Sequence, residues 1–128
     1  MRSPPAEDDI EAFARRALAA IPWRLRRHLG PIVIRVEEFP DAETVAAMGL
    51  DSPFDLLGLY RGVALPQKSA SDPRPDIDMV FLYRGPILAY CRDTGETPGE
   101  VVHHVLIHEI GHHFGFSDED MARIERAG

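Results

Sequence analysis

The residues best suited to chemistry form the run His-Glu-Ile-Gly-His at residues 108–112. His108 and His112 are four residues apart, so an α-helix places their rings on one face, one turn apart. Two imidazoles at this spacing can bind one zinc ion at about 2.0–2.1 Å each. Glu109 lies about 100° round the helix, beside the ion, where it can take a proton from an activated water. The run therefore predicts a site for metal-assisted hydrolysis.

A third ligand has to come from the chain that follows. Gly115 is three residues after His112 and can adopt a positive φ without steric cost, so it can turn the chain sharply. Such a turn brings Asp118 back toward the metal. Three protein ligands and one open position form the usual arrangement of hydrolytic zinc sites. We therefore predict one catalytic Zn²⁺ bound by His108, His112 and Asp118, with Glu109 as the general base.

Three other carboxylates remain alternatives for the third ligand. Glu119 and Asp120 would substitute if the loop is one residue longer than expected. Glu125 would serve if the ligand came from a later helix. Its position 13 residues beyond His112 is short for that geometry, so it ranks below Asp118.

Five of the six histidines lie between residues 103 and 113, and three of them have weaker assignments. His104 would be a strained third ligand on the same helix, so we expect it at the surface or supporting a ligand. His113 faces away from the metal on a helical projection and is expected to be structural, and His103 is expected to be exposed. By chance the five-residue pattern arises about 2 times in 100, and about once in 7,000 with Gly115 and Asp118 added.

Capping signals predict the helix that carries these residues. Thr97 can cap the helix, Pro98 suits its first position, and Glu100 completes a capping box. Gly115 ends the helix. The other expected elements are helices at 7–20, 41–50 and 118–126, strands at 32–37, 57–65 and 77–83, a short turn at 23–29, a helical turn at 87–90 and a polar loop at 66–76. The last two strands are expected to pair antiparallel.

Composition narrows the class of protein. The 128 residues are 45% hydrophobic and 27% charged, which favours a single domain over residues 1–128, with residues 1–6 disordered. The formal charge of −7 argues against nucleic-acid binding. One cysteine permits neither an internal disulfide nor a thiolate zinc site. No apolar run suits a membrane span or signal peptide, so we expect no membrane partner and a cytoplasmic location.

Beyond these patterns, the chain resembles the small bacterial zincin-like metallopeptidases known as minimal zincins, once catalogued as a domain of unknown function. The resemblance covers roughly residues 7 to 126. Its matching segments are Ala-Ile-Pro at 20–22, the strand at 32–38, Leu-Gly-Leu-Tyr-Arg-Gly at 57–62, Phe-Leu-Tyr-Arg at 81–84 and the histidine run at 108–115. Ten residues follow Asp118 in this sequence and Met121 is too close to serve, so we expect the site to lack the methionine turn of the metzincins.

The resemblance implies an α+β fold of the minimal zincin-like kind. In it, a small three- to four-stranded mixed or antiparallel sheet packs on an active-site helix and an N-terminal helix. It also implies a catalytic zinc, with ligands His108, His112 and Asp118 and with Glu109 as the base. The expected activity is that of a zinc metalloendopeptidase, acting as a monomer or weak oligomer on a peptide or protein. Strand 77–83 is expected to be an exposed edge that receives the substrate.

Two other functions remain open from sequence. One is a zincin-fold, metal-binding regulatory or interaction protein with little or no proteolytic turnover, because the short chain leaves few residues to enclose a substrate. The other is a metal-dependent hydrolase of non-peptide amides, which would use the same three ligands.

Overall fold

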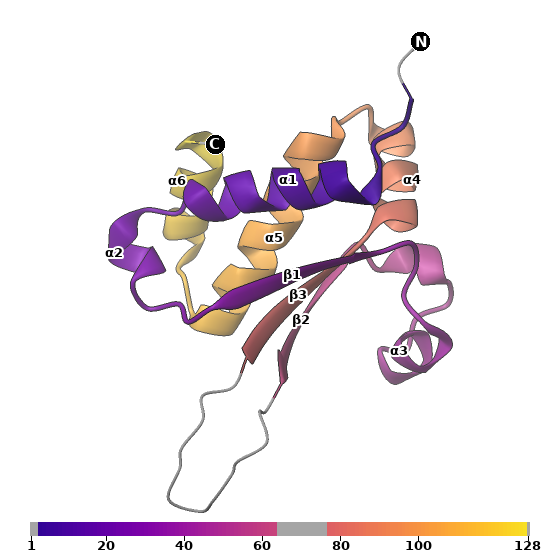
Figure 1. The fold of residues 1–128 in the computed structure, drawn as a ribbon, viewed down its shortest axis with the longest axis horizontal. Coiled ribbons are helices and arrows are strands. Elements are labelled where there is room, and N and C mark those ends of the chain that lie inside the picture. The colour runs from indigo at the N-terminus through magenta and orange to yellow at the C-terminus, as the bar shows by residue number, and fades with distance from the viewer. Residues whose placement is uncertain (1–2, 64–76, 128) are drawn as a thin grey trace, which may run out of the picture.

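The computed structural model describes residues 3–63 and 77–127, so the predicted loop at 66–76 lies outside the described residues. Helices surround a three-stranded sheet (Figure 1), which confirms the α+β class. The elements are α1 (Glu7–Ala19), α2 (Trp23–Arg26), β1 (Ile32–Glu37), α3 (Ala42–Ala47), the 3₁₀ turn η1 (Pro53–Asp55), β2 (Gly58–Val63), β3 (Ile77–Tyr83), α4 (Arg84–Thr94), α5 (Pro98–Phe114) and α6 (Asp118–Ala127).

The sheet has the strand order β1-β3-β2. β1 runs parallel to β3, and β2 runs antiparallel to it, which confirms the predicted pairing of the last two strands. Val80 faces Ile34 on one side and Tyr60 on the other. The prediction that β3 is an exposed edge is wrong: β3 is central, with Val80 and Leu82 fully buried, and β1 and β2 are the edges. The buried side chains of Val80 and Leu82 suit the middle of a sheet, where a neighbouring strand lies on each side.

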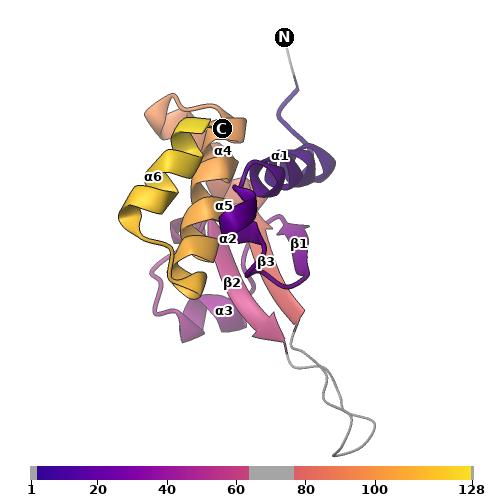
Figure 2. The same ribbon diagram turned by 90° about the vertical axis from the view of Figure 1, so that its left-hand side faces the viewer.

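Two helices cover one face of this sheet. α1 contacts both β1 and α5, and α5 contacts β2 and β3 (Figure 2). Ile10, Leu106 and Ile110 from these helices are fully buried against the strands. Burying each of these side chains contributes about 1.5–3 kcal/mol, so the packing fixes α5 firmly against the sheet.

The caps of α5 confirm the prediction made from the sequence. The Thr97 hydroxyl accepts a hydrogen bond from the Glu100 backbone N–H, and the Glu100 carboxylate accepts one from the Thr97 backbone. At the other end Gly115 adopts the left-handed conformation, with φ of 73°. The helix therefore has a defined start and a defined end.

The prediction for residues 87–90 was wrong in extent. In place of a single turn, α4 runs for 11 residues and begins directly after β3. Pro86 lies in the first turn of α4, where a missing N–H breaks no helical hydrogen bond, so the proline starts a helix there.

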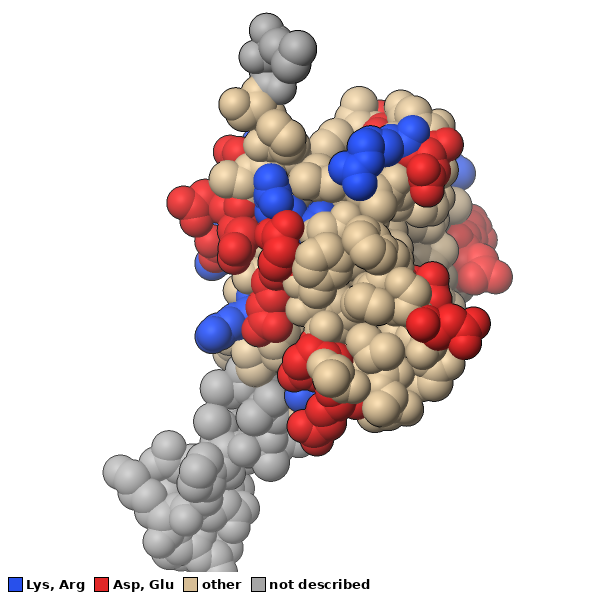
Figure 3. All heavy atoms as spheres, turned by 90° about the vertical axis from the view of Figure 1, so that its right-hand side faces the viewer, with Lys and Arg blue, Asp and Glu red and all other residues tan. Residues whose placement is uncertain are grey.

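The side of the molecule formed by α3, η1 and α4 is largely uncharged at its centre and bordered by charged side chains, most of them acidic (Figure 3). Phe39 and Phe54 are exposed there, with ring centroids 5.0 Å apart in an edge-to-face arrangement. Among the described residues, no helix combines the length and the apolar character that a membrane span requires.

Candidate metal centre

His108 and His112 lie one turn apart on α5, toward its C-terminal end. Their ring centroids are 5.9 Å apart, with the ring planes inclined at 59°. His108 is half-buried and His112 is exposed. The helix therefore presents both imidazoles on one face, as the four-residue spacing requires.

Glu109 is half-buried between α5 and the edge strand β2. Burial raises the pKa of its carboxyl above the ordinary value, because a charge is less stable away from water. A hydrogen bond from the Tyr60 backbone and the neighbouring imidazoles of His112 and His108 act in the opposite direction, lowering the pKa. Glu109 thus combines a strengthened affinity for protons with a fixed position beside the two histidines.

Asp118 is exposed and is the first residue of α6. Within the described ranges, one group of three potential ligands has donor atoms that all lie within 4.8 Å of one another, and it includes neither Asp118 nor His112. The structure therefore places Asp118 near the start of the returning helix without closing a three-residue set around it.

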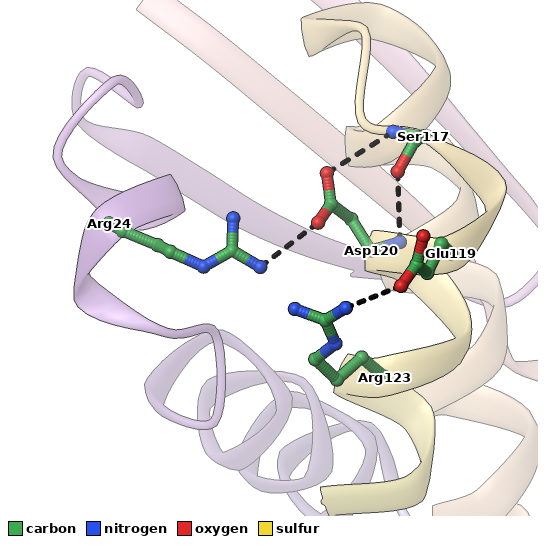
Figure 4. Close-up of polar contacts among 5 residues, drawn as sticks. All are labelled: Arg24, Ser117, Glu119, Asp120 and Arg123. Carbon is green, nitrogen blue, oxygen red and sulfur yellow. Dashed lines mark hydrogen bonds and ion pairs between the residues drawn. The ribbon is translucent and has the colours of Figure 1, made fainter.

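The two carboxylates next to Asp118 are engaged in other contacts (Figure 4). Asp120 and Ser117 exchange backbone and side-chain hydrogen bonds at 3.0 and 3.4 Å, which caps α6. Arg24 of α2 donates to Asp120 at 3.0 Å, and this hydrogen bond lowers the pKa of the carboxyl. Glu119 pairs with Arg123 at 2.6 Å. The contact between Arg24 and Asp120 anchors the start of α6 to α2.

Glu125 reaches the histidines from the far part of α6, which packs against α5. Its Oε1 atom lies 3.2 Å from His108 Nε2 and 2.7 Å from His104 Nδ1. The His104 and His108 rings are 4.1 Å apart. Sequence reasoning ranked Glu125 below Asp118 and expected His104 at the surface; the structure leaves His104 exposed and brings both residues to His108.

Two signals pointed to this grouping. His104 stands four residues before His108, which is the same spacing as that between His108 and His112. In addition, a sharp turn at Gly115 makes α6 return along α5, so a residue late in α6 faces the earlier turns of α5.

The remaining histidines of α5 differ in their surroundings. His113 stacks on Tyr60 with ring centroids 3.7 Å apart, and the Tyr60 hydroxyl contacts the Asp78 carboxylate. His113 therefore links α5 to β2. The prediction that His103 is simply exposed was wrong: it is half-buried, and its Nε2 atom is buried without a hydrogen-bond partner among the described residues.

A comparison with protein families supplies the wider context. The family model of the zincin-like metallopeptidases matches residues 29–127, from the loop before β1 to the end of α6. The chain belongs to this family. No protein with a curated description matches it at a significant level.

Membership among the zincin-like metallopeptidases implies zinc, and the donor atoms fit that metal. Imidazole nitrogen and carboxylate oxygen are standard zinc ligands. α5 supplies three imidazoles along one face, and α6 brings the carboxylate of Glu125 to two of them. The residues present can therefore hold a zinc ion without any cysteine.

Proposed function

We propose that this zincin-like protein is a zinc-dependent metallopeptidase that hydrolyses peptide bonds with Glu109 as general base. The observation that carries the proposal is the setting of Glu109. It is half-buried, adjoins two imidazoles on one helix face, and accepts a hydrogen bond from a neighbouring strand.

The ligands that we propose are His108, His112 and Asp118. Asp118 has no partner among the described residues, whereas Glu119 and Asp120 on the same turn are held by arginines. The anchored start of α6 also limits how far Asp118 can move from the end of α5. These features support Asp118 over its two neighbours as the third ligand.

Glu109 moves the proton in the proposed reaction. Its carboxylate takes a proton from the attacking water and later returns it to the leaving amine. Because burial raises its pKa, the carboxylate is a stronger base than an exposed glutamate. The Tyr60 backbone hydrogen bond keeps the carboxylate directed between α5 and β2. When bound, zinc supplies Lewis acidity, which polarises the peptide carbonyl and makes water more acidic.

The substrate that we propose is an extended peptide lying along β2. This strand is an edge of the sheet and contacts α5 beside Glu109. An edge strand can bind an extended chain through its backbone groups, with little demand on the side-chain sequence. This geometry supports peptides over compact non-peptide amides.

Glu109→Gln tests the proposal, because it keeps the shape of the side chain and removes the base. We expect the rate of peptide cleavage to fall by about 10²–10⁴-fold while zinc content stays the same. Glu119→Gln is the matched control, since Glu119 is an exposed glutamate that pairs with Arg123. Cleavage by Glu109→Gln at the parent's rate would rule out this role.

A second candidate is a metal-binding regulatory protein with little turnover. It is favoured by the contact between Glu125 Oε1 and His108 Nε2, which occupies one proposed ligand. Stoichiometric zinc without cleavage of any peptide in a complex peptide pool would support this candidate over the peptidase.

A further inference from the structure

Three donor atoms converge at the middle of α5, one turn away from His112. They are His104 Nδ1, His108 Nε2 and Glu125 Oε1, and all three lie within 4.8 Å of one another. Two come from successive turns of α5 and the third from α6, so the packing of the two helices creates the group. Neither His104 nor Glu125 belongs to the ligand set proposed above.

The carboxylate oxygen in this group has close neighbours but no hydrogen-bond partner in the part of the chain that the structure describes. Glu125 Oε1 is buried, and neither imidazole directs an aligned N–H toward it, although the two nitrogens are 2.7 and 3.2 Å away. A carboxylate–imidazolium pair would align an N–H with the oxygen. A cation bound between the three donor atoms would give the buried oxygen the partner that it lacks among the described residues.

The distances between the Glu125 carboxylate oxygen and the two imidazole nitrogens suit a small divalent ion. Ligand atoms about 2.1 Å from a tetrahedral centre are about 3.4 Å apart. The two nitrogen–oxygen distances, 3.2 and 2.7 Å, reach that value when the atoms separate by less than about 1 Å. Rotation of the exposed His104 side chain can provide this movement.

A pocket gives access to the group from solvent. It has a volume of about 430 Å³, and its lining includes His104, Glu125, Glu96 and Glu100. Three of the six residues that line the pocket carry carboxylates. Their negative charge favours entry of a cation and disfavours anions.

We propose that His104, His108 and Glu125 form a second site for a divalent transition metal such as Zn²⁺. The fourth position of this site faces the pocket. Because a neutral imidazole has one nitrogen lone pair, His108 serves one ion at a time. If the proposed function holds, the second site therefore competes with the catalytic set for His108.

Zinc binding measured without any substrate tests the site. His112→Ala weakens the catalytic set and leaves the second set intact, so we expect it to bind one Zn²⁺ in competition with a chromogenic chelator. Adding Glu125→Gln or His104→Ala to the His112→Ala variant should weaken its zinc binding by at least about tenfold. The absorption spectrum of bound Co²⁺ should change in the same variants.

Adding Glu119→Gln to His112→Ala provides the matched control and should leave the affinity unchanged. The proposal is overturned if His112→Ala binds no Zn²⁺, or if the double variants bind as tightly as His112→Ala. Circular dichroism of each variant verifies that the helices persist. Since Glu109→Gln retains both sets of ligands, its activity bears on the peptidase proposal alone.

Discussion

The backbone N–H of Tyr60 donates a hydrogen bond to the carboxylate of Glu109, joining edge strand β2 to helix α5. The close approach of these elements depends on Gly58. A Cβ atom at residue 58 would lie 2.6 Å from Cγ1 of Val105 on α5. The position of the proposed base is therefore set by the close approach of the β2 backbone to side chains of α5.

Shortening the side chain of residue 109 while keeping its carboxylate should show whether the position of the charge matters for catalysis. Glu109→Asp retains a carboxylate but withdraws it by one methylene from Tyr60 and from the reacting water. We expect the kcat for peptide cleavage to fall by about tenfold or more, with zinc affinity unchanged. Steady-state kinetics and a zinc titration measure the two effects. Full activity of Glu109→Asp would show that the reach of this side chain is unimportant.

His108 belongs to both proposed ligand sets, so its loss should affect metal binding most. Zinc at 100 times its Kd should stabilise the parent protein by about 2.7 kcal/mol. We expect His108→Ala to show no zinc-dependent rise in Tm, while His112→Ala and His104→Ala each retain part of it. Differential scanning fluorimetry with and without zinc measures this. Equal losses in the three variants would contradict the shared role of His108.

The packing of α6 on α5 depends on Gly111. A Cβ atom there would lie 2.3 Å from Sδ of the buried Met121, so Gly111→Ala forces Met121 to move. We expect the free energy of unfolding to fall by about 1–2 kcal/mol, since overpacking outweighs the gain in helix propensity. Urea denaturation measures it.

Two further variants determine whether the cost of Gly111→Ala comes from Met121. In a Met121→Ala background, Gly111→Ala should cost nothing or stabilise the protein, which a double-mutant cycle reveals. Gly99→Ala is the control on the same helix, because its Cβ atom would lie 3.8 Å from Phe13, an ordinary contact. A penalty that persists without Met121 would refute the packing explanation.

Asp41 should make stability depend on pH in the acidic range. It caps α3 by accepting a hydrogen bond from the Thr44 N–H at 2.7 Å. Hydrogen bonds from the Thr44 side chain and backbone lower the pKa of Asp41 below its usual 3.8. A lowered pKa contributes stability above pH 3.8, and this stability is lost as the pH falls through the folded value.

Asp41→Asn keeps a capping side chain and removes its charge. We expect its Tm to lie below that of the parent at pH 7 and the difference to shrink toward pH 3. Thermal melts across this range provide the measurement. A difference that stays constant with pH would mean that the carboxylate charge is not responsible.

The elements whose signals are local were predictable from sequence. Thr97, Glu100 and Gly115 mark the ends of α5 because caps depend on a few adjacent residues. The antiparallel pairing of β2 with β3 also followed from chain order. The central position of β3 did not follow from chain order. It depends on the pairing of β3 with β1, which is far from it in the sequence.

The residues of the candidate site that lie on one helix were predictable from sequence. The contacts between two helices were less predictable. The positions of His108, Glu109 and His112 follow from helical geometry alone. The contact of Glu125 with His108 depends on the rotation and depth of α6 against α5, which buried contacts such as that between Gly111 and Met121 determine. Those contacts carry no sequence motif.

The left-handed turn at Gly115 has a consequence for how this protein can change. Successive residues of α6 differ by about 100° in direction and by about 1.5 Å in height along the helix axis. A change of loop length that shifts the register of α6 against α5 by one residue would therefore present a different carboxylate to each histidine. The metal chemistry of such a helix pair can diverge through changes in loop length while every ligand residue is conserved.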